Sequence, residues 1–89
     1  MPTVIITHEV KDFASWKTGF DAHESMRVAG GIQITGIYQD FEKPSLVTVT
    51  AQFPSIEAVK GFMSNADIQA VMKESGVIGV PEIKVLKKA

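Results

Sequence analysis

Residues 30–55 of the chain read GGIQITGIYQDFEKPSLVTVTAQFPS. Two runs in this stretch, 32–40 and 45–53, alternate apolar and polar residues, and such alternation is typical of β-strands. The breaker FEKP at 41–44 separates the two runs. Because so short a connection joins neighbouring antiparallel strands, the stretch predicts a β-hairpin.

The residues before the hairpin predict a strand followed by a long helix. Residues 3–10 are rich in β-branched side chains, which favours a strand. Asp12 is placed to act as the N-cap of a helix that begins at Phe13, and the glycine pair 30–31 is placed to end it. We expect a single helix of about 17 residues, roughly 25 Å long.

The residues after the hairpin predict two helical segments and a last strand. Pro54-Ser55 opens a helix whose apolar residues repeat at helical spacing. Asp67 is placed to cap a further short helix over 68–75. Residues 79–81 are expected to form a loop, and 82–86 the last strand.

The resulting order of elements is β-α-β-β-α-β, the split βαβ arrangement of ferredoxin-like α+β domains. We expect residues 1–89 to form one such domain, a four-stranded antiparallel sheet with its helices on one face. The strands carry Ile, Val and Leu on both faces, and a sheet that is apolar on both sides usually has both sides covered. We therefore expect a homodimer, in which a second copy covers the helix-free face around a two-fold axis.

Composition excludes several classes of function. Nine Lys and Arg against ten Asp and Glu give a formal charge of -1, which excludes the positive field of a nucleic-acid-binding protein. The chain has no cysteine, and so no disulfide or thiolate metal site. It has neither an apolar stretch as long as a membrane span nor a basic, apolar leader, so we expect no membrane partner and a cytoplasmic protein.

One face of the expected first helix combines aromatic and ionisable side chains. At about 100° per residue, a stripe roughly 80° wide holds Phe13, Trp16, Phe20, His23 and Arg27. We expect this stripe to face the sheet, because it holds the aromatic residues.

Two interpretations of this stripe remain open, because buried charges are costly unless they are paired or line a cavity. In the first, a pocket lies between helix and sheet. Trp16 and Phe20 are then its ligand-binding walls, and His23 and Arg27 are its polar, catalytic contacts. In the second, Arg27 extends past the end of the sheet and His23 bonds a backbone carbonyl, so that both residues merely close the core.

His8 and Tyr38 are further candidates, near the ends of the first and second strands. Either could serve as a general acid or base. We expect His8 to be catalytic and Tyr38 to be ligand-binding. Alternation predicts that Tyr38 shares a strand face with Ile34, but it does not decide whether His8 shares the face of Ile6 that meets the helix. A structural role is the alternative for both residues.

Other chemistries have weaker support in the sequence. His8 and His23 lack the helical spacing of a paired-histidine metal site, so no metal is expected. The glycines form no phosphate-binding motif, and no Ser or Thr lies in a nucleophile elbow. The strand at 45–53 lacks the Lys and Arg of a ferredoxin-like RNA-binding module. We expect no cofactor.

These features resemble the dimeric α/β-barrel superfamily, and within it the small proteins of antibiotic-biosynthesis-monooxygenase type. The resemblance covers nearly the whole chain. It rests on Asp12-Phe13, Trp16, Phe20, His23, Arg27 and Gly30-Gly31 around the first helix, and on Phe53-Pro54-Ser55 before the second. It implies a ferredoxin-like protomer, a homodimer whose sheets form a barrel, and a ligand cavity between the sheet and helices of each protomer.

Enzymes of this superfamily include cofactor-free monooxygenases acting on aromatic polyketides, haem-degrading enzymes, isomerases and cyclases. The sequence lacks the asparagine-tryptophan-histidine set of the haem-degrading members. The resemblance thus implies a monooxygenase-, isomerase- or cyclase-like enzyme acting on a small aromatic or anionic ligand between the first helix and the sheet. A non-catalytic dimeric ligand-binding or structural module is the main alternative, and a ligand-sensing domain of the amino-acid-binding ferredoxin-like type is a third.

Overall fold

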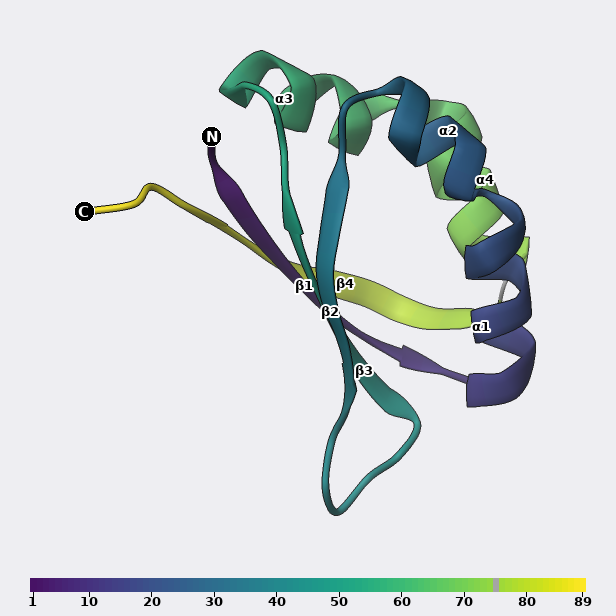
Figure 1. Ribbon diagram of the computed structural model, residues 1–89. Helices are drawn as coiled ribbons and strands as arrows, with labels where there is room; N and C mark the ends of the chain where they lie inside the picture. The colour runs from purple at the N-terminus through teal and green to yellow at the C-terminus, as the bar shows by residue number, and fades with distance from the viewer. Residues whose placement is uncertain (75) are drawn as a thin grey trace.

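The computed structural model describes residues 1–74 and 76–89. Its elements follow the expected order, and each of the two helical crossovers is divided in two (Figure 1). The elements are β1 (Thr3–Val10), α1 (Phe13–Ala22), α2 (Glu24–Ala29), β2 (Gln33–Gln39), β3 (Leu46–Gln52), α3 (Ile56–Ser64), α4 (Ala66–Glu74) and β4 (Val77–Leu86).

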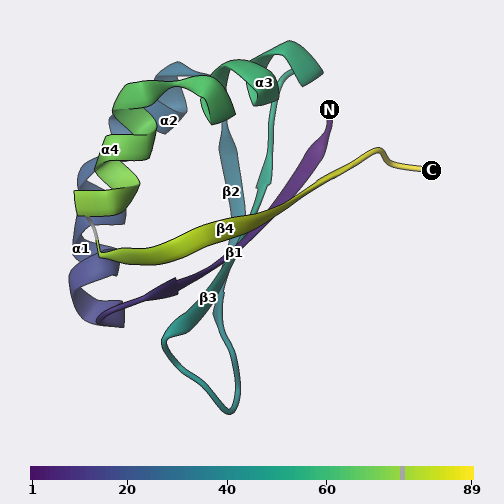
Figure 2. The same ribbon diagram turned by 180° about the vertical axis from the view of Figure 1, so that it is seen from behind.

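The strands form one antiparallel sheet in the order β2-β3-β1-β4, so that β1 and β3 lie in its centre. The register sets Val4 of β1 opposite Ala51 of β3, and His8 opposite Val47. In the described part of the chain, all helices cover one face of the sheet and the other face carries none (Figures 1 and 2). The predicted α+β, βαββαβ fold is confirmed.

The prediction of one unbroken helix before β2 is wrong, because the helix is interrupted at His23. The His23 amide bonds the carbonyl of Phe20, three residues back, instead of the carbonyl of Gly19, four residues back. Side chains also bond the carbonyls at this interruption: the His23 ring bonds the Gly19 carbonyl, and Arg27 adds a second bond to the Phe20 carbonyl. The residues of the stripe are thus at helical spacing in the sequence, although α1 and α2 are two separate helices.

A bulge at Thr35 reverses the alternation of β2. Ile34 and Gly36 pair with consecutive residues of β3 rather than with alternate ones. As a result Ile34 and Ile37 pack into the core, and Tyr38 points to the helix-free face, where it is 57% exposed. The prediction that Tyr38 shares a face with Ile34 is wrong for this reason.

β4 is longer than the sequence predicted. It begins at Val77 instead of Glu82, and the expected loop at 79–81 is a bulge within the strand. The bulge sets these three residues opposite the single residue His8 of β1. Gly79, with a φ of 73°, supplies the left-handed backbone conformation in it.

The helix boundaries also differ in part from the prediction. The Asp12 cap is confirmed, since its carboxylate accepts a 2.9 Å hydrogen bond from the Ser15 amide. α4 begins at Ala66 instead of residue 68, and its cap is Asn65, whose Oδ1 accepts from the Asp67 amide at 2.8 Å. The predicted end of this helix, residue 75, lies outside the described residues.

The core between the helices and the sheet is divided into two clusters. The first contains Val4, Ala51, Phe53 and Val59. The second contains Val10, Trp16, Val47 and Val49. Ile34 packs against both clusters.

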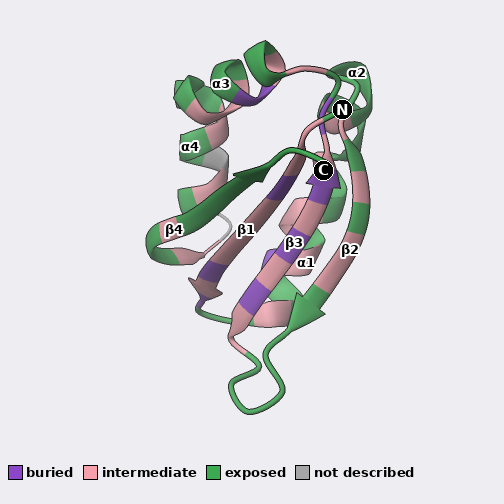
Figure 3. Cartoon of the chain, turned by 90° about the vertical axis from the view of Figure 1, so that its left-hand side faces the viewer, coloured by how far each residue is buried: buried purple, intermediate pink, exposed green. Residues whose placement is uncertain are grey.

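The helix-free face mixes apolar side chains with paired threonines, and Figure 3 looks onto it. Thr7 and Thr48 share a hydrogen bond of 3.0 Å, and Thr35 and Thr50 share one of 2.8 Å. Each pair satisfies its own hydroxyl groups in part, which lowers the cost of removing this face from water. The register assigns to the same face the apolar side chains Ile5, Tyr38, Leu46 and Leu86. The face is therefore only partly apolar.

Gly30 and Gly31 provide a matched test of the turn before β2. Gly31 has a φ of 74°, and a β-carbon there would lie 3.3 Å from the Pro54 ring, whereas Gly30 has a φ of -82° and clearances of 3.6 Å or more. We expect Gly31→Ala to lower the free energy of unfolding by about 1–2 kcal/mol. Gly30→Ala should change it by less than about 0.5 kcal/mol. Urea denaturation measures both, and equal effects would contradict a left-handed residue at 31.

Candidate functional site

A cavity of about 340 Å³ lies between the helices and the sheet. Residues from both core clusters line it, among them Trp16 and Val49 from one, and Ala51 and Phe53 from the other. The cavity therefore lies between the two core clusters.

The exposed members of the lining mark the opening of the cavity. They are Met26 and Gly30 at α2, Gly61 in α3, and Asn65 at the start of α4. The opening thus lies between α2 on one side and the junction of α3 and α4 on the other.

A row of contacting side chains forms one wall of the cavity. The rings of His8 and Trp16 lie 5.4 Å apart, and those of Trp16 and Phe20 are stacked 5.0 Å apart at 29°. The Arg27 guanidinium carbon lies 3.7 Å above the Phe20 ring, a cation–π contact. The row, His8–Trp16–Phe20–Arg27, runs from β1 along α1 to α2 and has a polar group at each end.

His8 faces the helices from the central strand β1, which settles the question that strand parity left open. Only 6% of the residue is exposed, and neither ring nitrogen has a hydrogen-bond partner among the described residues. Burial lowers the pKa of His8, because the surroundings disfavour the charged form. The lining of the cavity therefore includes a buried, neutral imidazole whose two nitrogens lack a partner among the described residues.

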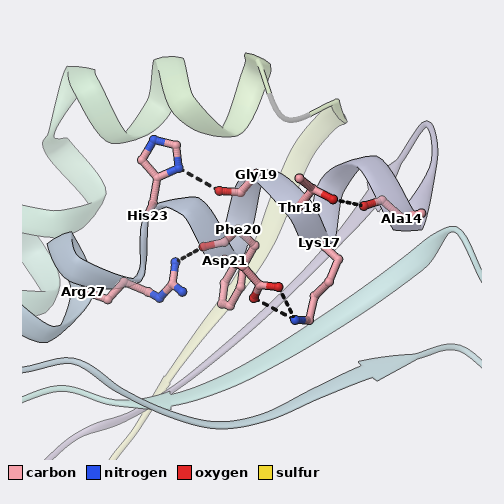
Figure 4. Close-up of polar contacts among 8 residues, drawn as sticks. All are labelled: Ala14, Lys17, Thr18, Gly19, Phe20, Asp21, His23 and Arg27. Atoms are coloured by element: carbon pink, nitrogen blue, oxygen red, sulfur yellow. Dashed lines mark hydrogen bonds and ion pairs between the residues drawn. The ribbon is translucent and has the colours of Figure 1, made fainter.

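Arg27 reaches back from α2 across the interruption at His23 (Figure 4). Its Nη1 donates a 2.7 Å hydrogen bond to the carbonyl of Phe20, while its buried Nε has no partner among the residues that the structure describes. Burial lowers the pKa of the guanidinium, and the charges of Glu24 and Asp21 oppose that effect. Arg27 still carries a positive charge at neutral pH, so it can attract an anion.

His23 is half-buried, and its Nδ1 donates a 2.8 Å hydrogen bond to the carbonyl of Gly19 (Figure 4). This is the carbonyl bond that the structural interpretation of the sequence expected. Yet His23 and Arg27 also line the cavity that the pocket interpretation expected. The structure thus contains the geometric features of both interpretations: the carbonyl bonds of these two residues and their position in the cavity lining.

The cavity brings together five of the six predicted site residues: His8, Trp16, Phe20, His23 and Arg27. Tyr38 does not line it, because the bulge in β2 turns this side chain to the opposite face.

Sequence reasoning missed the wall that α3 and α4 contribute. This wall includes Phe62, Asn65, Ile68 and Met72. Helical spacing was the available signal for the apolar members, but the same spacing describes an ordinary core face.

A second hollow, of about 420 Å³, lies between α4 and β4. It shares Ile6, Phe62, Ile68 and Met72 with the first cavity, so these four side chains separate the two spaces. None of the four residues of the aromatic row lines this hollow. The aromatic row therefore belongs to the first cavity alone, while Gln69 and Lys73 are among the residues that line the second hollow.

Two further findings concern other kinds of site. Within residues 1–74 and 76–89, no three His, Cys, Asp or Glu side chains lie close enough together to hold a metal ion. No helix in that part of the chain is long and apolar enough to span a membrane.

The burial of His8 has a consequence for stability. We expect His8→Phe to raise the free energy of unfolding at pH 7 by about 1 kcal/mol, because it removes a buried polar group without protein partners and keeps an aromatic ring against Trp16. In the wild type, His8 has no effect on the pH dependence of stability above its unfolded pKa near 6.5. As the pH falls below that value, the unfolded chain binds more protons than the folded one, and the free energy of unfolding falls.

Urea denaturation between pH 5 and 7.5 measures both effects. The wild-type free energy of unfolding should fall towards pH 5 by at most about 1.4 kcal/mol per pH unit from this group, and His8→Phe should flatten the curve. A variant that is less stable than wild type and equally pH-dependent would show that His8 is hydrogen-bonded in solution.

The chain was compared with known proteins. No protein-family model matches it, and no curated protein sequence matches it. Solved structures do match over nearly the whole chain. A provisionally named antibiotic biosynthesis monooxygenase from Bordetella bronchiseptica has a TM-score of 0.76 at 16% identity, covering 99% of this chain and 96% of its own.

Two other solved structures are equally similar. A provisionally named antibiotic biosynthesis monooxygenase from Caulobacter crescentus has a TM-score of 0.76 at 17% identity, with 99% of this chain and 89% of that one covered. A conserved protein from Methanosarcina mazei has a TM-score of 0.76 at 14% identity, with coverages of 99% and 92%. At such low identity the likeness concerns the fold. The chain therefore has the same ferredoxin-like α+β fold as these three proteins.

Proposed function

We propose that the protein binds a small, planar, partly apolar molecule, an anion or a phenol, in the cavity between its helices and sheet and acts on it by proton transfer. The observation that carries this proposal is the cavity itself, with a buried neutral His8 whose two ring nitrogens lack a partner among the residues that the structure describes. Buried polar groups in proteins are normally hydrogen-bonded, and exceptions cluster where a ligand or a reaction uses them.

The shape and lining of the cavity support a flat ligand. Trp16 and Phe20 are stacked along one wall, and aromatic rings favour offset stacking with other planar groups. Few polar groups interrupt the apolar lining, which is the usual composition of a small-molecule site.

The polar groups divide the chemistry between them. A neutral imidazole can accept a proton from a ligand hydroxyl or from an activated carbon, so His8 is suited to be a general base. The positive charge of Arg27 can then stabilise the negative charge that develops on the ligand. Proton abstraction of this kind would begin an isomerisation, a cyclisation or a monooxygenation of an electron-rich ring.

Gly61 is a further observation that supports a ligand-binding cavity. It lies within α3 at the opening of the cavity, and a β-carbon there would meet no atom within 4 Å. Glycine inside a helix costs roughly 0.5–1 kcal/mol relative to alanine, so a larger residue would fit and stabilise the helix. Proteins often retain such unfavourable residues where function needs them.

We also propose that the protein is a homodimer in which a second copy covers the helix-free face. The paired threonines and the apolar side chains among them suit that face to burial. A single chain of 89 residues has a small core, which pairing would extend.

A structural module is the alternative function, and one observation favours it. Both His23 and Arg27 bond backbone carbonyls at the interruption of the helix, so these residues would be needed even without a ligand. His8 makes no such bond, and it is therefore the residue that separates the two functions.

Gly61 allows a test of the proposed site. We expect Gly61→Ala to raise the free energy of unfolding by about 0.5–1 kcal/mol, and Gly61→Trp to abolish binding of 2-naphthol or 2-naphthoate in calorimetric titrations by closing the opening. Ala70→Trp, at an exposed position of α4 outside the cavity, is the matched control and should bind as wild type does. Failure of the wild-type protein to bind either compound would refute a site for planar aromatic molecules.

The homodimer has its own test. Light scattering should give a mass about twice that of the 9.7 kDa chain. Tyr38→Glu, which places a charge on the helix-free face, should yield the monomer, because an unpaired charge in an interface is costly. Ala70→Glu places the same charge on an exposed helix and should leave the dimer intact. A wild-type mass equal to one chain would remove the proposed interface.

A further inference from the structure

The two polar ends of the aromatic row differ in charge. His8 is a neutral imidazole at one end, and Arg27 is a cation at the other, with Trp16 and Phe20 between them. A ligand that lies flat along Trp16 and Phe20 therefore meets a different kind of polar partner at each of its ends.

The two ends also differ in depth. His8 is 6% exposed on the central strand β1, whereas Arg27 is only half-buried, on the helix that borders the opening. A ligand entering between α2 and the α3–α4 junction would bring its leading end to His8 and leave its trailing end near Arg27.

The anionic group that fits Arg27 carries a single charge. One of its nitrogens, Nη1, is already bonded to the Phe20 carbonyl, and its buried Nε has no partner in the described chain. Glu24 and Asp21 place negative charge near the guanidinium. In the described part of the chain, no Lys and no other Arg lines this cavity. A carboxylate suits this surrounding better than a doubly charged phosphate.

The volume of the cavity sets the size of the ligand. An apolar cavity of about 150 Å³ holds one benzene ring, and this cavity, at about 340 Å³, is roughly twice as large. Two fused rings are therefore the expected body.

We infer that the ligand class is a two-ring hydroxyaryl carboxylic acid, with the hydroxyl and the carboxylate at opposite ends, and that His8 is the residue that selects the hydroxyl. This inference rests on the proposed function. The hydroxyl enters first and hydrogen-bonds to a nitrogen of His8, the rings lie along Trp16 and Phe20, and the carboxylate meets the guanidinium of Arg27.

Three probes test the inference by calorimetric titration of the full-length protein at pH 7.5. They are 6-hydroxy-2-naphthoate, which has both polar ends, 2-naphthoate, which lacks the hydroxyl, and 2-naphthol, which lacks the carboxylate. We expect the two-ended probe to bind about ten-fold or more tightly than either one-ended probe, because each missing group leaves a buried polar partner unpaired.

Variants assign each end to its residue. In His8→Phe, 6-hydroxy-2-naphthoate should lose its advantage over 2-naphthoate, while the affinity for 2-naphthoate stays within about two-fold of wild type. In Arg27→Met, 6-hydroxy-2-naphthoate should no longer bind more tightly than 2-naphthol. Lys60→Met removes a charge from α3 outside the cavity, and it should change none of the three affinities.

The outcomes separate the inference from the function on which it rests. If the three probes bind wild type with equal affinity, or if His8→Phe keeps the preference for the hydroxyl, the inference is overturned and the proposed binding site stands. If none of the probes binds, both are overturned. The comparison of probes on wild type needs no variant, so an Arg27→Met protein that fails to fold does not affect the decision.

Discussion

The hydrogen bond from Arg27 to the carbonyl of Phe20 is the interaction on which the arrangement of the site depends. An interruption in a helix leaves carbonyl groups without their usual donors. Here the His23 ring bonds the Gly19 carbonyl, and Arg27 bonds the Phe20 carbonyl beside the His23 amide. Because these bonds are satisfied, the chain can stop one helix and start another above the sheet. The same bond holds the guanidinium over the Phe20 ring, so one interaction both caps the helix and positions the cation of the cavity.

The cavity follows from how the helices meet the sheet. Each end of the central strands is covered by its own cluster of buried side chains, and Ile34 packs against both. A small chain has little apolar surface to bury, yet this one leaves a space between the clusters, a glycine at its opening and an unpartnered histidine at its inner end. Each of these features opposes stability, and the proposed ligand would account for all three.

The sequence predicted the fold well, because the features that define it are local and periodic. Strand alternation gave the hairpin, the Asp12 cap gave the start of α1, and helical spacing gathered His23 and Arg27 with the aromatic residues. The errors have physical causes that periodicity cannot reveal. One extra residue at Thr35 turns every later side chain of β2 to the opposite face. The break at His23 leaves the helical spacing of the apolar residues unchanged, so that spacing does not reveal it. A cavity leaves no pattern in a sequence, since the residues around a void are the same types that fill a core.

The position of Trp16 gives the protein an optical property. It is the only tryptophan in the chain, it is 3% exposed, and it contacts both His8 and Phe20 within the row. Indole emission depends on the charge and polarity around the ring, and all tryptophan emission of the native protein originates from one place, the wall of the cavity. The protein therefore contains an intrinsic fluorophore whose emission would report on the charge of the neighbouring imidazole.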